Sequence, residues 1–302
     1  MKRNRWFLFA LVGSSVSAAA ISDRPEMFGE ALRGLTAAQV SAFNAGLAEF
    51  TSVETVADGL GPVFNGRSCA ECHNVPVTGG GSERLVTRFG KMTNGVFDPL
   101  PQFGGSLIQD HAIGPDDVPG LLQFLPDAMP AAATIVAHRR TTPLFGLGFV
   151  GAVPDADFYA LATREAARND GTAGRVSVVA DPVHGGTAVG KFGWKAQVPN
   201  LEQFSGDAYL NEMGITNPLF PNENCPSGNC AELAWNPMPA LNDDGEGVEQ
   251  FNDFMTLLAR RREPWAGSGT HPSLQARESS TTSAAIRVTS PRCAPARATS
   301  PR

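Results

Sequence analysis

Five consecutive residues, Cys69, Ala70, Glu71, Cys72 and His73, constrain this chain more than any other segment. Two cysteines three positions apart with a histidine directly after them form the C-x-x-C-H pattern, which is typical of the attachment site of a c-type haem. Each thiol at this spacing can form a thioether bond to one vinyl group of a porphyrin, and the histidine then lies under the ring as an iron ligand. The sequence therefore predicts one covalent haem c, tethered by Cys69 and Cys72, with His73 as an axial ligand of the iron.

The residues on either side of the motif favour this interpretation. Phe64 precedes the first cysteine by five positions and could pack on the edge of the porphyrin. The glycines at 79–81 let the backbone run close to a flat ligand. A thioredoxin-type dithiol would need a strand-turn-helix context, which this stretch rich in glycine and proline does not offer.

Two further cysteines, Cys225 and Cys230, allow two interpretations. They enclose a four-residue segment that contains a proline and a glycine, so a short disulfide is sterically reasonable and an oxidising compartment permits it. Alternatively, they could join Cys69 and Cys72, or His73, in a tetrahedral zinc site. That alternative would make the chain a zinc-stabilised binding module.

The first twenty residues are typical of a secretory signal peptide. Three basic residues near the start precede the apolar run 6–12 and the small-residue stretch 14–20. The apolar run is far shorter than the roughly 20 residues that cross a bilayer. We therefore expect cleavage after residue 20, no integral membrane span after cleavage, and a periplasmic location.

The charge distribution bears on the partner. The formal net charge is −6, and residues 21–266 are more acidic than this figure because both ends of the chain are basic. An acidic surface argues against nucleic acid as a partner, and it favours either simple solubility or docking to a redox partner protein with a basic surface.

Hydrophobic periodicity predicts four amphipathic helices, over residues 36–50, 155–168, 199–213 and 248–262. Thr36 and Gln39 form a capping box at the start of the first. A valine-rich alternation at 175–180 predicts a strand. Residues 267–302 form a low-complexity tail with few large aliphatic side chains, and we expect this tail to be disordered.

Four segments give the chain a resemblance to the di-haem oxidoreductase family, bacterial c-type haem proteins described as thiol oxidoreductases and peroxidases. They are residues 60–73, 139–148, 190–199 and 211–220. The resemblance implies a mainly α, cytochrome c-like haem domain over residues 21–266, with long irregular loops and a few short strands. It also implies periplasmic electron transfer and a second C-x-x-C-H in a C-terminal haem domain.

The chain departs from this pattern after residue 262. The tail follows where a second haem domain is expected, and Cys293 has neither a partner cysteine nor a following histidine. Because the second motif is absent from this sequence, we expect one haem here, and the departure argues against two-haem catalysis.

Several residues are candidates for the sixth iron ligand, and others are candidates to bind the haem propionates. Electron carriers close the iron with methionine or histidine, whereas reactive haems leave it open. The candidates are Met92, His111, Met129, His138, His184, Met213 and Met238, of which Met129 and Met238 are favoured because each precedes a proline. The propionates could be held by Arg139, Arg140, Lys191 and Lys195, unless these form only a solvated basic patch.

These observations lead to one main hypothesis and two alternatives. The main hypothesis is an exported c-type cytochrome that binds one covalent haem and transfers electrons. The first alternative is a haem-dependent oxidoreductase or peroxidase with an open iron site, and the second is the zinc-stabilised module.

Overall fold

The computed structural model describes residues 26–239 and 241–260. All of them fall in one compact unit, Met1–Arg262. The predicted signal peptide at residues 1–20 and the predicted tail at 267–302 lie outside the described residues.

Helix α1 (Ala37–Thr51) begins at the predicted capping box. The backbone N–H of Gln39 donates to the Thr36 hydroxyl, and the Gln39 side chain accepts from the Thr36 N–H at 3.0 Å. This reciprocal pair satisfies two N–H groups that the first turn leaves without helical partners.

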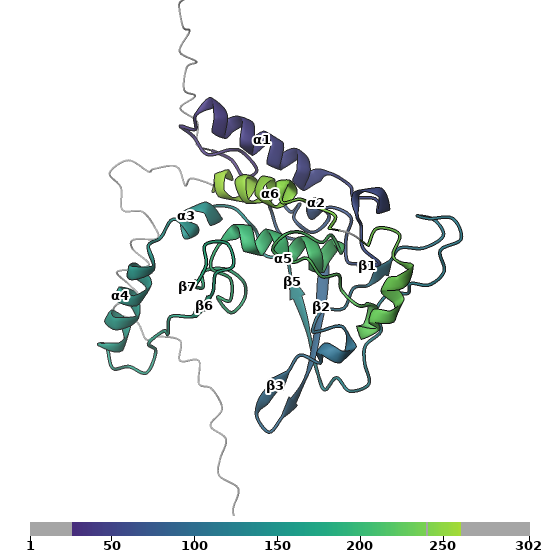
Figure 1. The fold of residues 1–302 in the computed structure, drawn as a ribbon. Coiled ribbons are helices and arrows are strands. Elements are labelled where there is room, and N and C mark those ends of the chain that lie inside the picture. The colour runs from purple at the N-terminus through teal and green to yellow at the C-terminus, as the bar shows by residue number, and fades with distance from the viewer. Residues whose placement is uncertain (1–25, 240, 261–302) are drawn as a thin grey trace, which may run out of the picture. The chain divides into compact units, whose positions relative to one another are not determined.

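Helix α1 packs against α6 (Glu246–Leu257), as Figure 1 shows. The ring of Phe254 on α6 lies 5.4 Å from Phe43 and 4.7 Å from Phe50, centroid to centroid. Gly46 lies at the crossing, where a Cβ atom would meet the Gln250 carbonyl oxygen and approach Phe254 Cβ to 2.9 Å. The two backbones come this close because Gly46 has no side chain.

The segment before α1 pairs with the segment after α6. The N–H of Leu32 donates to the Leu257 carbonyl at 2.8 Å, and the N–H of Ala259 donates to the Glu30 carbonyl at 2.9 Å. The two ends of the described chain are therefore hydrogen-bonded to each other. This pairing also explains why α6 ends at Leu257 rather than at the predicted residue 262.

Helix α5 (Leu201–Met213) forms the next layer against α6. The Asn200 side chain caps its start by accepting from the N–H of Gln203 at 2.8 Å. Leu201 and Met213 are buried. The helix ends at Gly214, whose φ of 67° is the left-handed conformation that glycine adopts without strain.

The largest sheet has three antiparallel strands in the order β3-β2-β5. Its strands are β2 (Leu85–Thr93), β3 (Val96–Asp98) and β5 (Ile135–Arg140), and Val86 pairs with Arg139. Two small antiparallel pairs accompany it: β1 (Val63–Phe64) with β4 (His111–Ala112), and β6 (Val178–Ala180) with β7 (Thr187–Val189).

The remaining elements are short or peripheral. They are α2 (Cys69–Cys72), α3 (Leu147–Gly151), α4 (Asp155–Ala166) and four 3-10 turns at Val56–Asp58, Pro101–Phe103, Pro226–Gly228 and Cys230–Trp235. In the described part of the chain, no helix is long and apolar enough to cross a bilayer.

The predicted mainly α, cytochrome c-like fold is wrong. Of the described residues, 32% are helical and 16% are in strands or bridges, and the sheets are small. The sequence pattern missed β2 and β5 because Gly90 interrupts the first and basic residues occupy the second. Their ladder depends on pairing between segments far apart in the chain, which strand propensity does not report.

Candidate functional site

A cavity of about 560 Å³ lies where the C-x-x-C-H motif, β5, α5 and α6 meet. This volume is within the range of about 300–1,000 Å³ typical of small-molecule and cofactor sites. Most of its wall is hydrophobic or aromatic. The wall includes Phe50, Cys69, Cys72, His73, Arg88, Arg139, Arg140, Leu144, Leu147, Lys191, Phe192, Trp194, Phe204, Tyr209, Glu212, Met213, Phe251 and Met255.

The motif reaches the cavity through one helical turn. Ser68 caps α2 by accepting from the N–H of Ala70 at 3.1 Å, and the His73 N–H donates to the Cys69 carbonyl at 3.0 Å. This turn brings both sulfur atoms and the imidazole to the same cavity. Cys69 and Cys72 are free thiols, and burial raises the pKa of each.

The hydrogen bond of His73 defines its tautomer. His73 Nδ1 lies 2.9 Å from the Gly80 carbonyl oxygen, which can only accept, so Nδ1 carries the proton. The lone pair is then on Nε2. Burial lowers the pKa of His73 to about 4, so the ring is neutral at ordinary pH. A neutral imidazole held by a carbonyl at its other nitrogen is the arrangement usual for metal-binding histidines.

The glycine loop at 79–81 is folded tightly against the motif. Gly79 donates to the His73 carbonyl, Gly80 to the Val77 carbonyl and Gly81 to the Val75 carbonyl, each at 2.8 Å. A Cβ on Gly80 would meet the Val75 carbonyl and lie 2.8 Å from the Val77 oxygen. This loop therefore places the acceptor for His73 and has no room for a side chain at Gly80.

These residues fit a covalently attached haem. The cavity offers two free thiols, a neutral imidazole with a fixed tautomer, and mostly apolar walls. Such a donor set matches the chemistry of c-type attachment.

Cationic side chains also line the cavity. Arg139 and Arg140 are among them, as is Arg88, which the sequence did not suggest. Lys191 lies there too, but its ammonium donates to the Val153 carbonyl at 2.9 Å and pairs with Asp155, 3.1 Å away. Lys195 does not line the cavity. The arginines are therefore better placed than the lysines to bind carboxylate groups of a ligand.

The structure brings different methionines to the cavity from those favoured by the sequence. Met129 and Met238 are 43% and 38% exposed and do not line it. Met213 and Met255 are each 4% exposed and do line it. The other sixth-ligand candidates, Met92, His111, His138 and His184, lie outside the wall.

A half-buried carboxyl is a feature of the cavity that sequence reasoning missed. Glu212 lines the cavity, and the Asn65 side-chain amide donates to it at 2.7 Å. Burial raises the pKa of Glu212, while Arg88 nearby opposes that shift. No local sequence pattern marked Glu212, because its surroundings come from segments distant in sequence.

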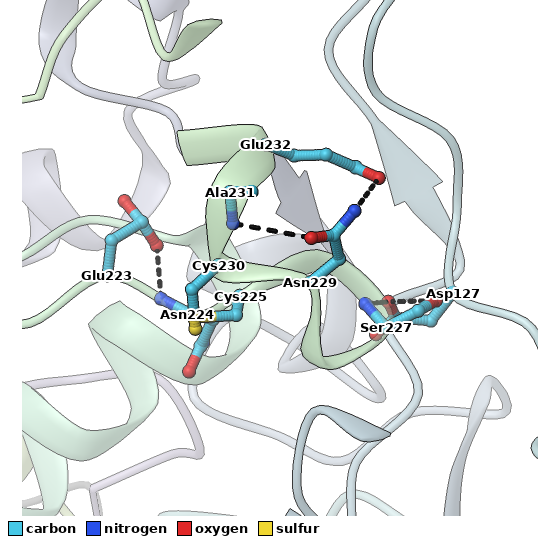
Figure 2. The surroundings of a disulfide bond; sticks show 9 residues. All are labelled: Asp127, Glu223, Asn224, Cys225, Ser227, Asn229, Cys230, Ala231 and Glu232. Carbon is cyan, nitrogen blue, oxygen red and sulfur yellow. Dashed lines mark hydrogen bonds between the residues drawn. A yellow bond between two sulfur atoms is a disulfide. The ribbon is translucent and has the colours of Figure 1, made fainter. Parts of the chain in front are cut away.

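Cys225 and Cys230 are joined in a disulfide, S–S 2.06 Å, outside the cavity wall (Figure 2). The Asp127 carboxylate anchors this turn by accepting from the Ser227 N–H at 2.6 Å. Sulfur atoms bonded to each other do not supply thiolates to a zinc ion. Among the described residues, no group of three or more histidine, cysteine or acidic side chains is arranged to hold a metal ion.

Comparison with known families gives one match. Residues 131–248 match the family described as "Di-haem oxidoreductase, putative peroxidase". The matched segment lies after the C-x-x-C-H motif and contains Arg139, Arg140, Tyr209 and Met213 of the cavity wall. The resemblance to this haem-dependent oxidoreductase family is thereby confirmed over these residues. Searches of curated proteins and of solved structures found no significant match.

Proposed function

We propose that this similarity to di-haem oxidoreductases reflects a c-type cytochrome that binds one covalent haem and transfers electrons. One observation carries the proposal: Cys69, Cys72 and a His73 ring that is protonated at Nδ1, with its lone pair on Nε2, meet in a single cavity of cofactor size. The family match supports haem chemistry independently, because it rests on residues outside the motif.

Each group in the cavity has a role in this proposal. Cys69 and Cys72 would hold the haem covalently, each through one thioether bond. His73 Nε2 would bind the iron, and Gly80 would hold the ring in place through Nδ1. Bound haem would supply one-electron redox chemistry.

The rest of the wall would hold and shield the cofactor. Arg139 and Arg140 would bind the propionates by charge-assisted hydrogen bonds. The thioether of Met213 or Met255 would be a further ligand that helps to hold the haem iron, because both side chains are buried and line the cavity. Phe50 and Phe251 would exclude water from the ring.

The compartment and partner belong to the same proposal. The C-x-x-C-H motif and the signal-like residues 1–20 together suggest export to the periplasm, where such haems are attached. The acidic body suggests a redox partner protein with a basic docking surface.

A peroxidase with an open iron site is the second candidate. Glu212 and Arg88 favour it, since a carboxyl and a guanidinium on the cavity wall could move a proton and stabilise a developing negative charge. The family description includes peroxidase chemistry as well.

Visible spectroscopy separates these functions. The full chain is co-expressed with haem-attachment machinery, and spectra are recorded oxidised, reduced, and reduced under carbon monoxide. Reduced haem bands that carbon monoxide leaves unchanged support the electron carrier, and a carbon monoxide shift supports the peroxidase. A protein without haem bands contradicts both.

Two sets of variants test the assignments. His73→Ala should abolish the low-spin spectrum, and Cys69→Ser with Cys72→Ser should leave no haem on the denatured chain. Met213→Ala and Met255→Ala test the further iron ligand. The variant that removes this ligand should allow carbon monoxide to bind the reduced haem. Met129→Ala is the matched control, because its exposed side chain is outside the cavity.

A further inference from the structure

The register between β2 and β5 determines which arginine side chains share the sheet face that borders the cavity. Val86 and Arg88 are two positions apart on β2, so they lie on one face, and both line the cavity. Arg139 pairs directly with Val86 and therefore shares that face. The cavity face of the sheet thus carries two arginines, Arg88 and Arg139.

Arg140 belongs to the opposite face of the sheet. It pairs with Leu85, which is exposed and does not line the cavity. On the same face, the side chains of Thr87 and His138 lie 3.2 Å apart, and neither residue lines the cavity. Arg140 is exposed and borders the cavity only at the end of its strand. Arg88 is therefore better placed than Arg140 to act together with Arg139.

Arg88 and Arg139 are diagonal neighbours across the two strands, because Arg88 pairs with Ala137. Diagonal positions on an antiparallel pair lie about 7–8 Å apart, within reach of long side chains. Two guanidinium groups this close repel each other unless an anion lies between or beside them. This arrangement is therefore suited to binding acidic groups.

The described residues supply no carboxylate to neutralise the two arginines. Arg88 Nη1 donates to the Ser106 hydroxyl at 3.3 Å. Within the part of the chain that the structure describes, neither Arg88 nor Arg139 forms an ion pair. Glu212 is the acidic side chain of the described cavity wall, and it accepts from the Asn65 amide at 2.7 Å instead. The cavity is therefore positively charged at the sheet.

We propose that Arg88 and Arg139 form the carboxylate-binding pair of the cavity, and that the carboxylates they bind are the propionates of the haem. A guanidinium binds a carboxylate through two parallel hydrogen bonds, and one haem carries two such groups. Arg140 contributes less, from the end of its strand. This inference rests on the proposed haem binding, and it adds that the bound group must carry free carboxylates.

Resonance Raman spectra of the haem-loaded full chain test the pair, since the propionate bending bands shift when a hydrogen bond to a propionate is lost. Arg88→Gln and Arg139→Gln should each shift these bands, and Arg140→Gln should shift them less. Lys195→Gln is the matched control, because Lys195 is outside the cavity wall, and it should leave the bands unchanged. Arg88→Lys keeps the charge but loses the planar fork, so its shift should be intermediate.

Porphyrin binding to the haem-free full chain gives a second measurement. Fluorescence titrations compare metal-free protoporphyrin IX with its dimethyl ester, which has no carboxylate. Wild type should bind the free acid about 10- to 100-fold more tightly than the ester. Arg88→Gln and Arg139→Gln should each weaken this preference, and the double variant should abolish it.

Succinate distinguishes the haem propionates from a free carboxylate as the ligand of the pair. By calorimetry, this dicarboxylate should bind the haem-free chain and not the haem-loaded chain, because the propionates then occupy both arginines. Equal succinate binding by the two forms overturns the inference, because the pair would then serve a free carboxylate.

Three further results overturn the inference while haem binding stands. They are propionate bands that shift as much in Arg140→Gln as in Arg88→Gln and Arg139→Gln, equal affinities for the porphyrin and its ester, and an ester preference that the double variant leaves intact. A chain that attaches no haem overturns the proposed function instead, and the porphyrin titration still measures the carboxylate preference. If Arg88→Gln does not fold, Arg88→Lys and Arg139→Gln decide by the same measurements.

Discussion

Replacing Gly80 with alanine tests the most constrained contact at the site. The new Cβ would press on the Val75 carbonyl and lie 2.8 Å from the Val77 oxygen, so the loop must open. Opening strains or breaks the hydrogen bond from Gly81 to Val75 and the bond between His73 and the Gly80 carbonyl. Overpacking costs about 1–3 kcal/mol, and each lost hydrogen bond costs about 0.5–1.5 kcal/mol. We expect Gly80→Ala to destabilise the protein by about 2–6 kcal/mol.

Urea unfolding of the haem-free chain measures this loss, and the spectrum of the haem-loaded chain reports on His73. Gly114→Ala is the matched control, because Gly114 is also in a loop but a Cβ there would meet nothing within 4 Å. It should be neutral or stabilising by about 0.4–1 kcal/mol. Equal stabilities of the two variants, with unchanged axial coordination in Gly80→Ala, would refute the reasoning.

Two further predictions concern stability. Gly46→Ala improves helix propensity by about 1 kcal/mol, but it places a Cβ against the α6 backbone, so thermal unfolding should show a net loss of stability of about 1–2 kcal/mol. Asn44→Ala, at an exposed position of the same helix, should show no loss. A Gly46→Ala protein more stable than wild type would contradict the α1–α6 packing. The double variant Cys225→Ser, Cys230→Ser should lose about 2 kcal/mol of stability, by the loop-closure estimate for so short a loop. An equal loss of stability for wild type in reductant would confirm that the disulfide is the cause. No loss in the variant would show that the disulfide adds no stability.

Local patterns predicted the helices well and the sheet poorly. The capping box at Thr36 marked the start of α1, and the helix at 199–213 was predicted almost to its ends. Val40 is exposed, because α6 covers only the face of α1 that carries Phe43 and Phe50. Strands β2 and β5 were missed, since their stability comes from pairing with each other across a long loop.

At the candidate site too, local patterns identified some residues and missed those that depend on contacts between separate segments. The motif marked Cys69, Cys72 and His73 because their chemistry depends on adjacent positions. The positions of the Gly80 carbonyl and of Glu212 depend on how segments outside the motif fold against it. The packing of α6 brings Met255 to the cavity, and this contact between distant segments has no local sequence pattern.

Residues 30–32 pair with residues 257–259, so this contact can form only after most of the described chain has been synthesised. Synthesis delivers the C-x-x-C-H motif long before α6, and α6 supplies Phe251 and Met255 to the cavity wall. Until α6 is in place, α1 has no partner for its buried face and the motif stays open on one side. Both thiols are therefore open to solvent on an incomplete chain, and α6, the last of the described helices, completes the wall around them.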